Sequence, residues 1–259
     1  MPIITLITDF GTKDFYAGAL KGQILSEIPA IQLVDISHRV EAFNINEAAF
    51  CLKNAYAHFP ENTVHLVLVN DDFSNDLRCL AVKHKGHYFL GFDNGMFNLA
   101  FEGEPELAVE LSISGEADMY RPAVFQQLLI ATAKELLGGR PISQLGRQVH
   151  HIKQRTGIQP VTQESVLRGT VIYIDEFENA ITNITKTLFE DNQKGRQFDL
   201  LFKRNERLSE ISRDYNAVPE GEKLCSFNSS GYLEIAINKG RASSLLGLRL
   251  GDTIQIDFV

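Results

Sequence analysis

The sequence has few of the residues that mark several large classes of protein. Its 259 residues include three cysteines and no tryptophan, and Cys51, Cys79 and Cys225 are widely scattered without CxxC spacing. An odd number of scattered cysteines predicts reduced thiols and argues against both a disulfide framework and a zinc site. The seven histidines lack the His-x-x-x-His spacing of a helical metal site, so we expect no metal.

Long apolar runs, an excess of basic charge and phosphate-binding loops are also missing. No run of about eighteen apolar residues could span a bilayer, and no signal-peptide pattern precedes the first strand, so we expect a cytoplasmic protein without a membrane partner. The formal net charge of -8 argues against general nucleic-acid binding, because a phosphate backbone requires a basic surface. Neither GxGxxG nor GxxxxGK followed by Ser or Thr occurs, which argues against nucleotide enzymes built on those loops.

The first half of the chain contains alternating strand and helix patterns. The overall composition, with 44% hydrophobic and 22% charged residues, is typical of a globular protein. The alternation predicts an α/β layered domain with a mostly parallel central sheet. The expected strands are 3–7, 32–35, 64–69, 80–83 and 88–92, and the expected helices are 16–27, 44–59 and 123–137.

The second half has a different pattern. Residues 153–166 are polar and irregular, and we expect them to link a domain of residues 1–152 to a domain of residues 167–259. Beyond the linker, strand-length segments follow one another, and no comparable helix separates most of them. This pattern predicts a smaller C-terminal β-barrel-like domain. Its clearest strands are expected at 169–174, 197–202, 233–237 and 253–258.

Two carboxylates stand close to the end of the first strand. Asp9 follows the apolar run 3–7, at the position where ligands of open α/β sheets bind. Asp14 follows five residues later across a turn that contains Gly11, so both carboxylates could accept hydrogen bonds from paired hydroxyls such as a ribose diol. The alternative is that Asp14 only caps the following helix.

The same segment resembles the opening of a known family. Residues 8–22 read TDFGTKDFYAGALKG, which is similar to T-D-F-G-x-x-D-x-Y-V-G-x-M-K-G of the S-adenosyl-L-methionine (SAM) hydroxide adenosyltransferases. These enzymes are also called SAM hydrolases (adenosine-forming) and are related to fluorinases and chlorinases. The resemblance covers the chain in order. Its further motifs are VDISH (34–38), GFDNG (91–95), IDEFENAITNI (174–184) and NSSGYLEIA (228–236).

The resemblance implies a site for SAM or adenosine that draws on both domains. Asp9 and Asp14 would contact the ribose and the methionine region, and Phe43, at the position of a family tryptophan, would form a wall of the pocket. In the family, the first domain of one subunit and the second domain of its neighbour form the site together within a trimer. The resemblance therefore implies a homotrimer with sites at its subunit interfaces.

The second domain would contribute the contacts to the amino-acid end of SAM. By resemblance, Asp175 and Asn179 would hold this end with Phe177 nearby, and Ser229 matches a family contact to the carboxylate. The alternative for Asn179 is an ordinary turn or edge residue.

The loops that carry the hydrolytic residues of the family are altered here. In the family these residues form an Asp-Arg-His set within V-D-P-G-V-G-T-x-R-R and H-G-R-D. The corresponding residues of this chain are Asn70 at the aspartate, Leu77 at the first arginine and Gly115 at the histidine, and only Arg78 is retained. Asn70 is neutral and a poor base, Leu77 cannot pair with an anion, and Gly115 has no side chain to move a proton.

Neighbouring residues could replace the lost set. A shift of the alignment by one residue brings Asp71 to the aspartate position and Arg78 to the first arginine, without restoring the histidine. Glu116 lies beside the vacant histidine position and could orient a water, although acidic loop residues are usually just solvated. The candidate catalytic residues are therefore Asn70, Asp71, Arg78 and Glu116.

Three functions are compatible with these residues. The first is hydrolysis of SAM to adenosine and L-methionine by attack of water at the 5′-carbon. The second is a catalytically silent protein that binds SAM or adenosine, for example as a sensor, and the third is a structural trimer without ligand. Retention of Asp9, Asp14, Asp175 and Asn179 favours the first two. No cofactor is expected, since SAM would be the substrate or ligand.

Overall fold

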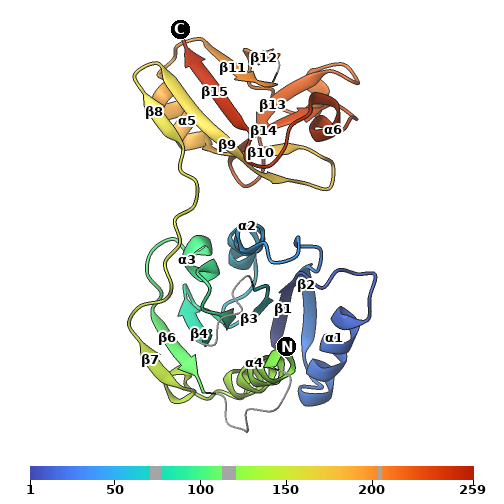
Figure 1. Cartoon of the computed structure of the whole chain (residues 1–259), viewed down its shortest axis with the longest axis vertical. Coiled ribbons are helices and arrows are strands. Elements are labelled where there is room, and N and C mark those ends of the chain that lie inside the picture. Colours follow the sequence, from blue (N-terminus) through green and yellow to red (C-terminus); the bar gives the residue numbers. More distant parts are fainter. Residues whose placement is uncertain (71–76, 113–120, 204–205) are drawn as a thin grey trace. The chain divides into compact units, whose positions relative to one another are not determined.

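Two compact units, Met1–Gly157 and Ile158–Val259, make up the chain. The structure is a computed structural model that describes residues 1–70, 77–112, 121–203 and 206–259 (Figure 1). Each unit has its own sheet and its own apolar core, so the two are described separately below.

The first unit is built on a mixed sheet with the strand order β2-β1-β3-β5-β4-β6-β7. Strands β2, β1, β3 and β5 are parallel, and β4, β6 and β7 continue the sheet in antiparallel fashion. The parallel arrangement expected from the sequence thus covers one half of the sheet. The strands are β1 (Ile3–Thr8), β2 (Gln32–Ser37), β3 (Val64–Leu68), β4 (Cys79–His84), β5 (His87–Phe92), β6 (Leu107–Leu111) and β7 (Arg147–Val149).

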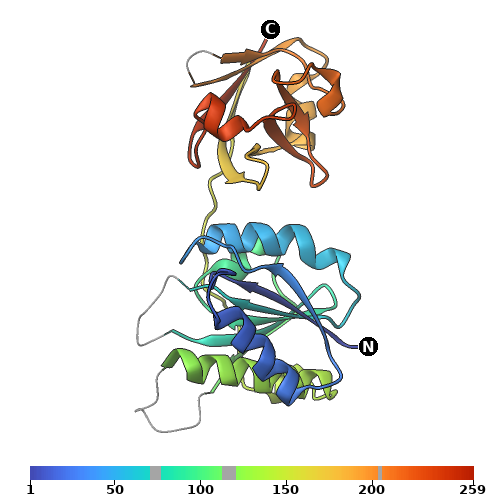
Figure 2. The same cartoon turned by 90° about the vertical axis from the view of Figure 1, so that its right-hand side faces the viewer.

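Helices cover both faces of this sheet. Figure 2 shows the sheet edge-on between α2 and α4. Leu20 and Ile24 of α1 pack on the same face as Leu129 of α4, and α2 and α3 cover the other face. Burial on both faces explains why the central strands are apolar without alternation. The helices are α1 (Tyr16–Glu27), α2 (Ile45–Ala55), α3 (Met96–Ala100) and α4 (Arg121–Leu137).

The limits of α2 follow from local chemistry. The side chain of Asn44 caps the helix by accepting a hydrogen bond from the backbone N–H of Glu47 at 3.1 Å. The α-helix ends at Ala55, and a 3₁₀ turn, Tyr56–His58, continues it up to Phe59. The helix expected over 44–59 is therefore α-helical over most of its length. Pro60, which cannot continue a helix, follows.

The core of the first unit also contains buried histidines. Nδ1 of His65 lies 2.7 Å from Oγ1 of Thr5, and its Nε2 lies 3.3 Å from Nδ1 of His87. The rings of Phe89 and Tyr56 pack against His65, with centroids 4.9 Å and 6.2 Å away. Burial lowers the pKa of His65 to about 3, with a smaller contribution from His87, and burial also lowers the pKa of His87. His65 is therefore neutral at physiological pH.

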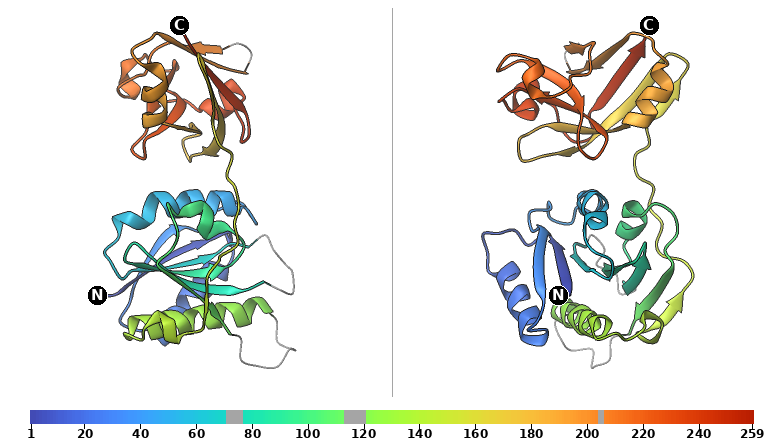
Figure 3. Two further views of the ribbon diagram at one scale, coloured as in Figure 1. Left: turned by 90° about the vertical axis from the view of Figure 1, so that its left-hand side faces the viewer. Right: turned by 180° about the vertical axis from the view of Figure 1, so that it is seen from behind.

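The second unit is an antiparallel, barrel-like sheet with the strand order β12-β11-β15-β9-β10-β14-β13, and β8 pairs with β9. The last strand in the sequence, β15 (red in Figure 3), lies inside the sheet between β11 and β9. The α/β class of the first unit and the barrel-like architecture of the second confirm the predicted fold class. The strands are β8 (Val161–Gln163), β9 (Val166–Ile174), β10 (Ala180–Thr185), β11 (Phe198–Phe202), β12 (Glu206–Leu208), β13 (Lys223–Phe227), β14 (Tyr232–Ile237) and β15 (Thr253–Phe258).

Two details of the second unit differ from the sequence prediction. Residues 153–166 are not irregular throughout, because β8 forms within them and pairs with β9 from Val161 to Gln163. Two α-helices, α5 (Lys186–Gln193) and α6 (Ala242–Leu246), also lie between the strands. In the described part of the chain, no helix combines the length and apolar character that a membrane crossing needs.

Candidate functional site

Asp9 stands where β1 ends, and its carboxylate is fixed by a distant part of the chain. Its Oδ2 accepts a hydrogen bond from the backbone N–H of Phe43 at 2.9 Å. Partial burial raises the pKa of Asp9, and the hydrogen bond from Phe43 opposes this shift. The turn beyond it is anchored as well, because the N–H of Gly11 donates to the carbonyl of His38 at 2.7 Å. The segment after β1 is thereby tied to the end of β2.

The VDISH motif lies at the end of β2, and its histidine, His38, is held by two neighbouring side chains. Nδ1 of His38 lies 2.8 Å from Oγ1 of Thr8, and its Nε2 lies 3.0 Å from Oδ1 of Asp35. Lys21 of α1 pairs with the same aspartate at 2.5 Å. His38 is buried, so it links the ends of β1 and β2 beneath the surface that carries Asp9.

Phe43 contributes through both its backbone and its ring. Its φ of 67° lies in the left-handed region, which costs a bulky residue about 1 kcal/mol or more. The ring is 57% exposed, and its role as a wall of the pocket stays a prediction. The same backbone conformation directs its N–H to Asp9.

Asp14 does not cap helix α1. The N-cap residue of α1 is Phe15, and no side-chain hydrogen bond caps the helix there. Asp14 is exposed, and it lies next to an exposed aromatic pair, Phe15 and Tyr16, whose ring centroids are 4.3 Å apart. The capping alternative is therefore wrong, and Asp14 remains available to a ligand.

Of the four candidate catalytic residues, the structure describes two. Asp71 and Glu116 lie outside the described residues. Oδ1 of Asn70 accepts a hydrogen bond from the Asn94 side chain at 3.4 Å. Arg78 forms ion pairs with Asp93 and, at 3.7 Å, with Glu110. Both described residues are thus engaged by side chains that directly follow β5, and Arg78 also by Glu110 of β6.

The GFDNG motif, to which sequence reasoning assigned no role, supplies these contacts. The carboxylate of Asp93 is buried between Arg78 and the backbone N–H of Lys153, which donates to it at 2.7 Å. The side chain of Asn94 donates to the carbonyl of Val69 at 3.1 Å and accepts from the N–H of Met96 at 3.1 Å. Asp93 and Asn94 therefore tie three separate segments together at the ends of β3 and β5.

In the second unit, Asp175 organises the turn between β9 and β10. Its Oδ1 accepts hydrogen bonds from the N–H groups of Phe177 at 3.0 Å and Asn179 at 2.8 Å. Its Oδ2 accepts a third, from the Asn179 side chain at 3.0 Å. This is the Asx-turn chemistry typical of aspartate in turns. Asn179 is 3% exposed and Phe177 is 75% exposed, so the turn presents an aromatic ring to solvent.

Glu178 fixes the same turn to a later part of the chain. Its φ of 62° is left-handed. Its carboxylate accepts from the N–H of Ser244 at 3.0 Å and from the Ser244 hydroxyl, and it pairs with Arg241 at 3.1 Å. The hydrogen bonds of Glu178 thus hold the turn against the start of α6.

Two residues that sequence reasoning missed extend the Asp175 turn inward. Nδ2 of Asn179 donates to the hydroxyl oxygen of Tyr215 at 3.3 Å, and that hydroxyl donates to Oε1 of Glu234 at 2.6 Å. Burial, followed by the contact with Glu234, raises the pKa of Tyr215. The available signal was an acidic residue inside the apolar strand 232–237, which is unusual for a buried strand unless it is paired.

Ser229 lies apart from this network within the same unit. It is an exposed residue in the turn between β13 and β14. The turn is closed by Asn228, whose Oδ1 accepts from the N–H groups of Ser230 at 3.0 Å and Tyr232 at 3.1 Å. No described contact joins Ser229 to Asp175 or Asn179.

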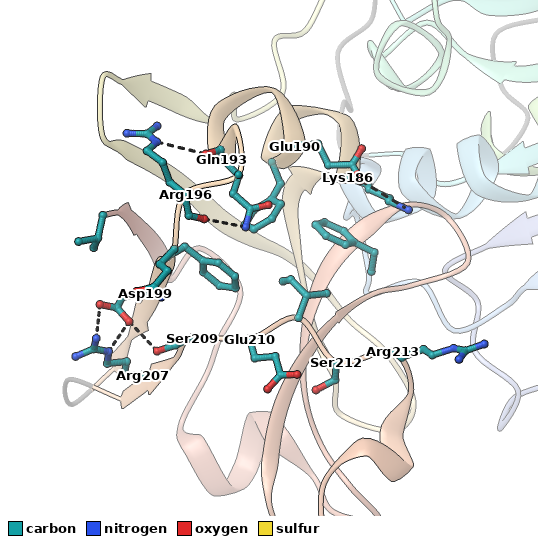
Figure 4. Close-up of a pocket in the computed structure, with 17 residues that line it drawn as sticks. Lys186, Glu190, Gln193, Arg196, Asp199, Arg207, Ser209, Glu210, Ser212 and Arg213 are labelled. Atoms are coloured by element: carbon teal, nitrogen blue, oxygen red, sulfur yellow. Dashed lines mark hydrogen bonds and ion pairs between the residues drawn. The ribbon is translucent and has the colours of Figure 1, made fainter.

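A hollow in the second unit is not formed by the predicted residues. It encloses about 900 Å³ in the second unit (Figure 4) and is lined by α5, β11 and residues 207–213. Arg207 and Ser209 each donate a hydrogen bond to the carboxylate of Asp199 at its edge, and Phe189 also lines it. None of Asp175, Phe177, Asn179 and Ser229 lines it.

The fold and the polar groups define a class of protein. An α/β unit and an antiparallel barrel-like unit each place a carboxylate at a strand end, which is typical of proteins that bind small polar molecules. No group of three His, Cys, Asp or Glu side chains within the described ranges could hold a metal ion.

Comparison with known proteins identifies the family. The family models of the SAM hydroxide adenosyltransferase N-terminal and C-terminal domains match residues 4–146 and 169–255. The chain therefore belongs to the SAM hydroxide adenosyltransferase family, as its motifs predicted.

The relatives match the whole chain. A protein from Methanocaldococcus jannaschii named (R)-S-adenosyl-L-methionine hydrolase is 28% identical, over 99% of this chain and 96% of the relative. A protein of the same name from Thermus thermophilus is 27% identical, over 98% of each chain. The crystal structure of an uncharacterized conserved protein from Thermotoga maritima superposes with a TM-score of 0.86 at 28% identity, covering 98% of this chain and 99% of that one.

Proposed function

We propose that this protein binds SAM and hydrolyses it to adenosine and L-methionine. The observation that carries the proposal is the Asp9 carboxylate, which is held at the end of β1 by the N–H of Phe43. A carboxylate has about four acceptor positions, so Asp9 can accept ribose hydroxyls while it keeps this contact. Family membership and the name of the relatives from M. jannaschii and T. thermophilus support the same activity.

The proposed reaction needs little acid catalysis. An oxygen lone pair of water forms a bond to the 5′-carbon while the bond from that carbon to sulfur breaks. The electron pair of the broken bond goes to the sulfonium sulfur, which leaves as neutral methionine. The attacking water then loses a proton to solvent, which gives the 5′-hydroxyl of adenosine. The protein must therefore align water, carbon and sulfur and hold both ends of SAM rigidly.

Residues of the second unit are suited to the amino-acid end of SAM. Asp175 is a carboxylate and Asn179 carries an amide carbonyl, and both can accept hydrogen bonds from an ammonium group. Ser229, exposed on its turn, can donate its hydroxyl proton to the carboxylate. By resemblance, these residues meet Asp9, Asp14 and Phe43 of a neighbouring subunit within a homotrimer. Light scattering would then give a mass of three times 29.0 kDa, and a monomeric mass would contradict this assembly.

A catalytically silent SAM-binding protein is the second candidate. The observation that favours it is the set of contacts made by the two described candidate catalytic residues, Asn70 and Arg78. Asn70 is a neutral amide hydrogen-bonded to Asn94, and the retained Arg78 is ion-paired with Asp93 and Glu110. Neither can take a proton from water in this arrangement. Under this alternative the ligand is bound and released unchanged.

Calorimetric titration with SAM and with adenosine, followed by chromatography after long incubation, separates the candidates. Hydrolysis predicts SAM binding and the appearance of equal amounts of adenosine and methionine. Tight SAM binding without adenosine would support the silent protein. Absence of binding to both ligands would contradict both candidates and favour a structural trimer. A matched Asp71→Asn and Glu116→Gln pair then tests whether either carboxylate orients the water.

A further inference from the structure

A buried carboxylate in the second unit has no role in the proposed contacts to SAM. Glu234 is 3% exposed and lies on β14, opposite Ser226 of β13. Its strand neighbours Leu233 and Ile235 belong to the apolar core. No described residue forms an ion pair with Glu234, so its burial depends on hydrogen bonds. Its Oε1 accepts two hydrogen bonds, from the Tyr215 hydroxyl at 2.6 Å and from the Ser226 hydroxyl at 3.2 Å.

The hydrogen bond to Glu234 determines whether the Tyr215 hydroxyl donates to Asn179 or accepts from it. A tyrosine hydroxyl has one proton, and in Tyr215 this proton is donated to Glu234. The hydroxyl oxygen can therefore only accept towards Asn179. It accepts from Nδ2 of Asn179 at 3.3 Å.

Asn179 is thereby held in one of the two orientations open to a side-chain amide. Its Nδ2 faces the hydroxyl oxygen of Tyr215 and Oδ2 of Asp175, which it contacts at 3.0 Å. In the opposite orientation, Oδ1 would face these two acceptors without a proton between them, which is unfavourable in a buried position. Asp175 and the Glu234-bound Tyr215 thus act together on the same amide.

The carbonyl of Asn179 is the group left for a ligand. No described residue donates to its Oδ1, and within the described part of the chain this oxygen is not among the fully buried polar atoms that lack a hydrogen bond. The oxygen therefore keeps some contact with solvent. Since the two amide protons are donated to Asp175 and Tyr215, the side chain can only accept a hydrogen bond from a ligand.

We propose that Tyr215 and Glu234 are positioning residues that orient the Asn179 amide, so that its carbonyl selects an N–H donor on the ligand. The proposal rests on the proposed function, in which that donor is the ammonium group of SAM. It gives a specific role to the two residues that sequence reasoning missed.

Tyr215→Phe tests this role, and Ser226→Ala is its matched control. Both variants remove one hydroxyl from Oε1 of Glu234, but only Tyr215→Phe also frees an amide proton of Asn179. We expect Tyr215→Phe to weaken SAM binding roughly three- to tenfold, the value of about one hydrogen bond, and Ser226→Ala to leave it within about twofold. Both should lower the unfolding midpoint to a similar extent. Glu234→Gln should resemble Tyr215→Phe, because a glutamine amide can donate to the Tyr215 oxygen and release its proton towards Asn179.

A measurement without ligand separates this proposal from the proposed function. The side-chain amide signals of Asn179 in an NMR spectrum should shift in Tyr215→Phe and in Glu234→Gln, and remain near their wild-type positions in Ser226→Ala. Unchanged Asn179 signals, or equal loss of SAM affinity in Tyr215→Phe and Ser226→Ala, would overturn the positioning role. If the wild-type protein binds no SAM, the proposed function fails, and the Asn179 signals alone decide on the positioning role.

Discussion

The two units hold their strand-end carboxylates in different ways. Asp9 of the first unit accepts from Phe43, 34 residues away in the sequence, whereas Asp175 of the second unit accepts from Phe177 and Asn179, two and four residues further on. The first arrangement requires that β1, β2 and the segment before α2 have already assembled. The second is a turn whose chemistry is local. A change of core packing should therefore disturb Asp9 more than Asp175.

The units also differ in histidine content. Lowering the pH should therefore give the largest difference in stability between them. All seven histidines lie between residues 38 and 151, within the first unit. The pKa of His65 falls from 6.5 to about 3 on folding, so the unfolded chain binds the additional proton. Stability is therefore lost as the pH falls from about 6.5 towards 3, by on the order of 3–5 kcal/mol for this group. Hydrogen exchange should show protection of the first unit falling from pH 7 to pH 4 while that of the second unit persists.

The control for acid sensitivity is a histidine at the surface. His58→Gln should leave this pH dependence unchanged, because His58 is exposed. Earlier loss of protection in the second unit would show that carboxylates, and not the buried histidines, govern acid unfolding.

Asp175→Ala should give the next largest effect. The variant removes the acceptor of three hydrogen bonds within the β9–β10 turn and should cost about 2–3 kcal/mol of unfolding free energy. Denaturant unfolding measures this loss. Asp191→Ala, which removes an exposed aspartate, should stay within about 0.5 kcal/mol of the wild type. Equal losses in both variants would show that the turn does not depend on Asp175.

Asp9→Ala should affect binding more than stability. We expect adenosine affinity to fall by roughly tenfold to a hundredfold, because hydrogen bonds from ribose hydroxyls to a charged group contribute about 1.5–3 kcal/mol. Calorimetry with Asp9→Asn is the control, since asparagine keeps an acceptor for the N–H of Phe43 but lacks the charge. Unchanged adenosine affinity in Asp9→Ala would contradict the ribose role.

Phe43→Gly should have the smallest effect on stability. Relief of the left-handed strain, about 1 kcal/mol, is nearly balanced by the greater freedom of glycine in the unfolded chain. We expect an unchanged unfolding midpoint with several-fold weaker SAM binding, because the exposed ring is lost. A clear fall in stability would show that the ring packs more tightly than its exposure indicates.

The sequence predicted the elements that have strong apolar periodicity. The helix expected over 16–27 and the strand expected over 253–258 have the bounds of α1 and β15. Helix α5 was not predicted because it is short and polar, with Phe189 as its buried residue and a cap from Thr185. The strand β10 was missed because Thr182, Asn183 and Thr185 interrupt its apolar pattern.

For the candidate site, local chemistry was predictable and distant partners were not. Asp9 and Asp175 could be selected as polar residues at strand ends. The contact of Asp9 with Phe43 depends on the left-handed backbone conformation of Phe43. The residue type does not predict this conformation. The chain from Asn179 to Tyr215 to Glu234 joins three separate segments, so only the folded sheet brings them together.

The position of β15 inside its sheet has a consequence for folding during synthesis. β15 pairs with both β9 and β11, so these strands lack a neighbour until residues 253–258 have left the ribosome. The first unit is complete at residue 157, and its core can form about one hundred residues earlier. Since domains generally fold as units in the order of synthesis, the α/β unit should mature first. The sheet of the second unit would be completed later, once residues 253–258 are available to pair with β9 and β11.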